Sequence, residues 1–258
     1  MLIVVSPAKS LDYESPLATT KFTQPEMLDR SAELIDIMRT KSAVEVAKLM
    51  SISPSLAQLN VDRYADWEPK FTKRNARQAL LAFNGDVYDG MAARTTFSDD
   101  DFAHAQKSFR ILSGLYGLLR PLDLMMPYRL EMGTELKSSK GANLYNFWGD
   151  EITLALNAAV KKSPGEKVLV NLASQEYFGS VRPAKLNAPV ISPSFLDRGP
   201  SGDTKIISFF AKKARGVMAS WIIRERITSA DDLVNFNSNG YEFDAARSTA
   251  ERPVFVRP

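Results

Sequence analysis

The chain of 258 residues contains no cysteine and a single histidine, His104. Without cysteine there can be no disulfide, thiol nucleophile, iron–sulfur cluster or thiolate zinc site. One histidine rules out a multi-histidine metal site, so any metal would need carboxylate ligands, and we predict neither a metal centre nor a cofactor. On a helix beginning near Ser98, His104 points away from the apolar face, which favours a solvated side chain over a catalytic one.

Long apolar runs are also absent, because no stretch reaches the roughly 18 residues that a membrane helix needs. The apolar run at residues 2–5 has no basic region before it and is too short for a signal peptide. At 45% hydrophobic and 24% charged residues, the composition is that of an ordinary globular chain able to bury a core. We therefore predict a cytoplasmic protein with no membrane partner.

Strand-like and helix-like apolar patterns alternate along the chain. We predict strands at 2–5, 80–83, 167–172, 190–191, 193–196 and 205–210, with a final edge strand at 253–256. The predicted helices lie at 25–39, 43–50, 54–65, 72–79, 98 onward, 146–160 and 212–227, and the predicted flexible loops at 134–143 and 197–204. This mixture indicates an α/β or α+β fold: a single domain over residues 1–258, with a mixed central sheet flanked by helices and a helical insertion near residues 25–80.

The apolar segment 111–133 carries four charged side chains, Arg120, Asp123, Arg129 and Glu131. Burying a charge is unfavourable unless it is paired or hydrogen-bonded. These four groups therefore either pair with one another as a structural network or face a ligand, and both interpretations stay open. In the second case, the two carboxylates are candidate pocket acids.

Polar or basic residues directly follow three of the predicted strands. Lys9 lies just beyond the first strand, Ser174 beyond the second, and Lys212 beyond the third. If these strands are parallel neighbours, their ends meet at the sheet edge where open α/β sheets bind ligands. This arrangement predicts a site for an anionic ligand.

Segment 205–226 is strongly basic, with six lysines and arginines against Glu225 alone. A helix packed through its apolar face would present these cations as one dense surface. That surface is either simply solvated or a contact for phosphate and nucleic acid. The candidate nucleic-acid or anion-binding residues of the chain are Lys9, Arg120, Arg129, Lys212, Lys213 and Arg215.

Seven motifs, in order and nearly from end to end, closely resemble the YaaA family of bacterial peroxide-stress proteins. They are Ser6-Pro-Ala-Lys9, Phe83-Asn-Gly-Asp-Val-Tyr88 and the segments 112–124, 127–133, 144–150, 171–174 and 210–216. The resemblance weakens past Phe243. It implies a cytoplasmic protein of the hydroperoxide response that limits damage from intracellular iron. It also implies double-stranded DNA binding through a positively charged cleft and a helix-hairpin-helix element, but no catalytic residues.

The hairpin element is best placed at residues 44–67, where two short helices flank a turn and carry Lys48 and Arg63. This stretch lacks hairpin glycines, and the glycines of Gly114-Leu-Tyr-Gly117 do not have the usual hairpin spacing.

Two hypotheses of function remain. The first is a DNA-binding stress protein that contacts backbone phosphates through its cations. The second is an uncharacterised enzyme acting on a nucleotide or other anionic small molecule, with Lys9, Asp123, Arg129 and Glu131 lining a pocket. An open basic groove favours the first, and a deep pocket with paired acids and shifted pKa values favours the second.

Overall fold

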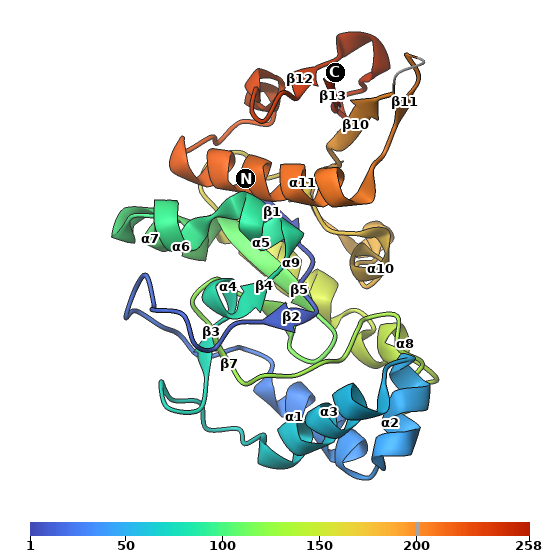
Figure 1. The fold of residues 1–258 in the computed structure, drawn as a ribbon. Helices are drawn as coiled ribbons and strands as arrows, with labels where there is room; N and C mark the ends of the chain where they lie inside the picture. Colours follow the sequence, from blue (N-terminus) through green and yellow to red (C-terminus); the bar gives the residue numbers. More distant parts are fainter. Residues whose placement is uncertain (200–201) are drawn as a thin grey trace.

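The computed structural model describes residues 1–199 and 202–258 and is built on a mixed central sheet with the strand order β6-β5-β1-β8-β9. Its strands are β1 (Leu2–Val5), β5 (Phe109–Ser113), β6 (Gly117–Leu119), β8 (Leu169–Asn171) and β9 (Val190–Ile191). The β1 strand runs parallel to β5 and β8, and β8 runs parallel to β9, while β6 is antiparallel to β5. Helices flank this sheet (Figure 1), which confirms the predicted α/β class.

The β1 strand occupies the middle of the sheet because all of its residues are apolar. All four side chains are completely buried, as expected for a strand covered on both faces. Its parallel neighbours fix where its carboxyl end lies: Leu2 pairs with Leu169 and Ile3 with Phe109. The residues that follow β1 and β8 therefore emerge side by side.

The helices around the sheet include α5 (Asp86–Met91), α7 (Asp99–Ser108), α9 (Glu151–Lys162) and α11 (Ser208–Arg224). Figure 1 shows α11 lying across α5. A Cβ atom added to Gly216 would lie only 1.8 Å from the Val87 carbonyl oxygen, so only glycine allows this close approach. This contact fixes the position of the basic residues on the first turns of α11.

The predicted helical insertion is present as α1 (Leu28–Arg39), α2 (Ala43–Met50) and α3 (Pro54–Asp66). These helices lie together at the opposite end of the molecule from the C-terminus (Figure 1). Ser42 forms a capping box with Glu45, and Ser53 caps α3 just before Pro54, so each helix start follows from local chemistry.

Between Asp66 and Gly85, two predicted elements are wrong. The predicted helix 72–79 is a turn followed by β3 (Arg77–Gln78), which pairs antiparallel with β7 (Leu124–Met125). The predicted strand 80–83 is mostly helix α4 (Ala79–Ala82), followed by β4 (Phe83–Asn84). Short apolar runs such as Ala-Leu-Leu-Ala carry no periodicity that separates a buried helical turn from a strand.

A second sheet near the C-terminus has the order β11-β10-β13-β12. Its strands are β10 (Ser194–Arg198), β11 (Thr204–Lys205), β12 (Glu242–Phe243) and β13 (Val254–Arg257). The last strand lies between β10 and β12, so its predicted edge position is wrong. Of the predicted loop 197–204, both ends belong to strands, and residues 200–201 lie outside the described residues.

The predicted strand 205–210 is also wrong, because only Lys205 is in a strand and α11 begins at Ser208. Ile206 and Phe209 are 60% and 54% exposed, so this apolar run does not enter a sheet. The remaining elements are β2 (Ser10–Leu11), α6 (Ala93–Thr96), α8 (Leu144–Trp148), α10 (Gln175–Phe178) and 3-10 turns at Pro183–Lys185, Asp231–Asn235 and Ala245–Arg247. Across the described part of the chain, no helix combines the length and apolar character needed to cross a membrane.

Candidate nucleic-acid and anion-binding groove

The carboxyl ends of β1 and β8 are joined by two serines. Ser6 follows β1, and its hydroxyl oxygen accepts a hydrogen bond of 2.9 Å from the Ser174 backbone N–H beyond β8. The two hydroxyl oxygens are also 3.2 Å apart and hydrogen-bonded. These two strands are thus the parallel neighbours that were predicted, and polar groups from both line one cavity.

That cavity, here called the strand-end pocket, has a volume of about 410 Å³. It is lined by residues 6–10, 84–88, Leu172, Ser174, Glu176, Tyr177, Lys212 and Arg215. Lys212 and Arg215 arrive from the first turns of α11 instead of from a third parallel strand. The predicted convergence of these cations with Lys9 therefore occurs, but through helix packing.

Glu131 lies beside this pocket and joins two of the predicted cations. Its carboxylate is 3.1 Å from Lys9 Nζ and 2.9 Å from Arg129 Nη2. Lys9, Arg129 and Glu131 line a small cavity that shares Tyr177 with the strand-end pocket. A carboxylate among these cations offsets the repulsion between like charges.

Arg120 and Asp123 form a separate network and line none of the pockets identified in the described residues. The fully buried Asp123 carboxylate is 2.9 Å from Arg120 Nη2 and accepts a hydrogen bond of 2.6 Å from the Thr23 hydroxyl. Arg120 also pairs with Glu26 at 2.9 Å. Burial raises the pKa of Asp123, although the bonds to Arg120 oppose the shift. This pair therefore holds loop 23–26 in place, and the expectation that it lines the strand-end pocket is not met.

Lys213 also lies outside these pockets, although its neighbour Lys212 lines one. Consecutive residues of a helix point about 100° apart, so adjacent lysines do not share a face. Lys212 is 3.8 Å from Asp86 of α5. The two lysines therefore differ in their surroundings while sharing charge and exposure.

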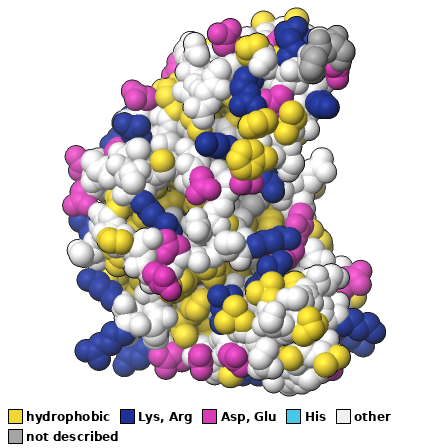
Figure 2. All heavy atoms as spheres, in the orientation of Figure 1, with side chains coloured by type: hydrophobic (Ala, Val, Ile, Leu, Met, Phe, Trp, Pro, Cys, Tyr) yellow, Lys and Arg dark blue, Asp and Glu magenta, His cyan; other side chains and the backbone are white. Residues whose placement is uncertain are grey.

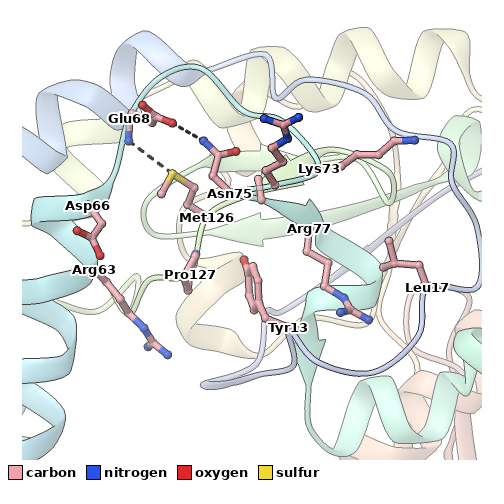
Figure 3. Close-up of a pocket in the computed structure, with 12 residues that line it drawn as sticks. Tyr13, Leu17, Arg63, Asp66, Glu68, Lys73, Asn75, Arg77, Met126 and Pro127 are labelled. Atoms are coloured by element: carbon pink, nitrogen blue, oxygen red, sulfur yellow. Dashed lines mark hydrogen bonds between the residues drawn. The ribbon is translucent and has the colours of Figure 1, made fainter.

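A larger cavity of about 670 Å³, here called the arginine pocket, was not predicted from the sequence. Its basic residues are Arg63 on α3, Lys73 and Arg74 in the following turn, and Arg77 on β3. Figure 3 shows Tyr13 between Arg63 and Arg77, while the Lys73 side chain extends away from these three residues. The Lys73 ammonium lies over the Phe22 ring, 5.3 Å from its centroid.

These four cations have no carboxylate within 4.0 Å in the described part of the structure. Arg77 is only 6% exposed; it donates to the Ser15 carbonyl, and its buried Nε has no hydrogen-bond partner. Burial lowers the pKa of both Arg63 and Arg77, yet a guanidinium stays protonated near neutral pH. The carboxylates of Asp66 and Glu68 also line the arginine pocket, but neither forms an ion pair with its cations. Four cationic side chains against two acidic ones leave the lining with an excess of positive charge.

A connecting pocket of about 530 Å³ lies between the two cavities, and its charged lining residues are Arg63, Asp12 and Glu14. It shares Tyr13, Arg63 and Pro127 with the arginine pocket, and Asn84 with the strand-end pocket. The three pockets together are here called the basic groove, after the cations at its two ends. Figure 2 shows one face of the molecule hollowed, with Lys and Arg side chains, and Asp and Glu side chains among them, around an apolar floor.

One sequence signal for the arginine pocket exists in the stretch Lys70-Phe-Thr-Lys-Arg-Asn-Ala-Arg77, which has four cations and no acid. A helix over 72–79, as predicted, would have spread these side chains around its axis, so the predicted helix did not indicate a cluster of cations. Within residues 1–199 and 202–258, no three His, Asp or Glu side chains form a group that could hold a metal ion.

The molecule thus combines a mixed α/β fold with a groove whose two ends carry clusters of cations. A family model described as peroxide stress protein YaaA matches residues 1–247. The chain belongs to this family, and its general role is therefore in the response to peroxide stress.

Proposed function

We propose that this protein acts in peroxide stress by binding double-stranded DNA through the basic groove, and that it thereby limits iron-mediated oxidative damage in the cytoplasm. The observation that carries the proposal is the set of unpaired cations in the arginine pocket. A cation already neutralised by a carboxylate gains little from a phosphate, whereas a free one gains the full interaction and releases condensed counterions from DNA.

The hairpin-like stretch expected to contact DNA reaches the groove at the end of α3. Helices α2 and α3 meet through a tight turn at Ser51–Ser53, where Ser51 has a left-handed backbone with φ of 52°. Arg63 of α3 lines both the arginine pocket and the connecting pocket. We therefore assign the hairpin element to these two helices, with Arg63 as its phosphate contact.

Segments far apart in the chain, from Ser6 to Arg215, contribute to this groove. This supports the proposal that residues 1–258 work as a single domain. Contacts to phosphate carry little sequence information, so we expect binding to duplexes of any sequence.

Counterion release offers a physical route from DNA binding to protection against iron. Ferrous ions are among the cations that associate with duplex phosphates, and a protein that neutralises those phosphates displaces them. Ferrous iron held on DNA generates hydroxyl radicals from hydrogen peroxide at the site where they do most harm. Displacement moves this reaction away from the DNA.

The test is a salt titration of binding to a labelled duplex, followed by fluorescence anisotropy. Four phosphate contacts predict a slope of about −3 to −4 in a plot of log affinity against log salt concentration. A flat slope, or no binding at low salt, would rule the proposal out. In parallel, the protein should slow the nicking of plasmid DNA by ferrous iron and hydrogen peroxide at low salt, and lose this effect at high salt.

A further inference from the structure

The strand-end pocket differs from the rest of the groove in shape and lining. Its volume of about 410 Å³ falls within the range of small-molecule sites. Tyr88 and Tyr177, each 8% exposed, lie in its wall together with Val87 and Leu172. Apolar and aromatic walls of this kind suit a flat aromatic ring better than a sugar–phosphate backbone.

Arg215 is the exception among the charged groups of this pocket. Lys9 pairs with Glu131, Lys212 lies 3.8 Å from Asp86, and Glu176 accepts a hydrogen bond of 3.0 Å from the Gly133 N–H. Arg215 is partly buried and, within the described residues, has neither an ion pair nor a hydrogen bond. A buried charge without a partner is unfavourable, and a bound anion would relieve that cost.

Unused hydrogen-bonding groups accompany this charge. The Asn84 side-chain amide has no hydrogen-bond partner in the described structure, and it can both donate and accept. Asn84 also lines the connecting pocket, so it stands where the strand-end pocket opens into the groove. The Ser6 and Ser174 hydroxyls, which are hydrogen-bonded to each other, also line the pocket at the strand ends.

The topology places this pocket where ligands of α/β sheets commonly bind. Strand β1 has parallel neighbours on both sides, with β5 on one and β8 and β9 on the other. The next sheet strand after β1 is β5 on one side, whereas the next after β8 is β9 on the other, so the order of strands reverses between β1 and β8. Ligands of open α/β sheets commonly bind at the carboxyl ends of two such strands.

We propose that the strand-end pocket binds a single nucleotide, with its phosphate on Arg215 and its base between the tyrosines and the apolar wall. The Asn84 amide lies within reach of the pocket mouth to contact the edge of the base. The nucleotide is either free in solution or turned out of a DNA strand lying in the groove. This inference goes beyond duplex binding and does not require it.

The first experiment titrates the full-length protein, without DNA, with the four deoxynucleoside 5′-monophosphates by calorimetry. We expect at least one to bind, with its nucleoside and inorganic phosphate each weaker by about tenfold or more, because each lacks half of the interaction. The proposal is overturned if none of the four binds at millimolar concentration and the second experiment below also shows no fluorescence change. Because no duplex is present, this result is independent of the test of DNA binding.

Variants locate the phosphate. Arg215→Met should weaken binding by about ten- to a hundredfold, since a hydrogen bond to a charged group is lost, and Arg215→Lys should restore part of it. Lys213→Met is the matched control. It also removes one positive charge, from a residue that is two positions away in sequence and lies outside the pocket. If Arg215→Met does not fold, Asn84→Ala should weaken binding by about threefold or more. Equal affinities for wild type and all of these variants would refute the assigned site.

The second experiment distinguishes the source of the nucleotide. A duplex carrying a mispaired 2-aminopurine reports by fluorescence whether the protein unstacks that base. A fluorescence change that Arg215→Met abolishes and Lys213→Met retains would identify a nucleotide of the strand. Binding of a mononucleotide without this change would identify a free nucleotide. If neither mononucleotide binding nor a fluorescence change is observed, the pocket binds no nucleotide and the proposal is wrong.

Discussion

The two ends of the basic groove carry similar numbers of cations but differ in what surrounds them. At the arginine pocket, Arg63, Lys73, Arg74 and Arg77 have no carboxylate partner in the described structure. At the strand-end pocket, both lysines are paired and only Arg215 is free. Charge pairing, and not the count of basic residues, therefore separates a surface suited to a polyanion from a pocket suited to one small anion.

The sharpest way to break this comparison is to reverse the unpaired charge. Lys73→Glu combined with Arg74→Glu should weaken duplex binding by about a hundredfold, because two phosphate contacts become repulsive. The slope of the salt titration should also fall by about 1.8 for the two lost contacts. Both side chains are exposed, so the free energy of unfolding should change by no more than about 0.5 kcal/mol.

The matched control for this variant is Lys161→Glu with Lys162→Glu on α9. These residues are adjacent, exposed and outside the groove, and their reversal changes the net charge equally. If anisotropy titrations show equal losses for the two double variants, binding depends on net charge alone, and the groove has no special role.

The role of charge pairing at the strand-end pocket can be tested by removing the partner of one of its cations. Asp86→Asn removes the carboxylate 3.8 Å from Lys212 and should strengthen duplex binding by about threefold, the effect of an exposed ion pair of about 0.6 kcal/mol. Asp231→Asn removes an exposed carboxylate outside the groove and is the control. The same titration should show less effect for the control, and a decrease for Asp86→Asn would contradict the role assigned to pairing.

The smallest expected effect is on pH dependence, and it separates the two ligands. The groove is lined by no histidine; burial lowers the pKa of His104, the one histidine of the chain, which lies outside the groove on α7. Duplex affinity should therefore be constant between about pH 6 and pH 8. A mononucleotide should bind a few-fold more tightly as pH rises through about 6, because its phosphate loses a second proton. The measurement is calorimetry for the mononucleotide and anisotropy for the duplex, at matched salt. If both affinities changed in parallel with pH, a group of the protein would be titrating instead of the nucleotide phosphate.

Segment 111–133 shows why part of the site could be predicted and part could not. Its four charged groups pair as Arg120–Asp123 and Arg129–Glu131, and each pair follows one of the two interpretations left open by the sequence. The first is a buried structural pair, and the second lies at a pocket. Their spacing alone does not tell them apart, because the difference comes from Thr23 against one pair and Lys9 against the other.

The wrong prediction of a strand at 205–210 and the failure to predict the arginine pocket have the same cause. An apolar run predicts burial only if another element covers it, and Ile206 stays 60% exposed among the described residues. The arginine pocket combines side chains from α3, a turn and β3 with Tyr13 of another segment. No local sequence pattern indicates that these segments come into contact.

The sequence by itself determined the family, the α/β class, the buried β1 strand, the helices α2, α3 and α7, and the presence of basic residues after the first strand and on α11. These depend on interactions between residues close together in the chain, or on long runs of specific motifs. Only the tertiary structure decided which cations are neutralised, that α11 brings Lys212 and Arg215 to Lys9, and that three pockets join into one groove. The physical reason is that electrostatic pairing depends on distances between side chains far apart in sequence, which packing alone sets.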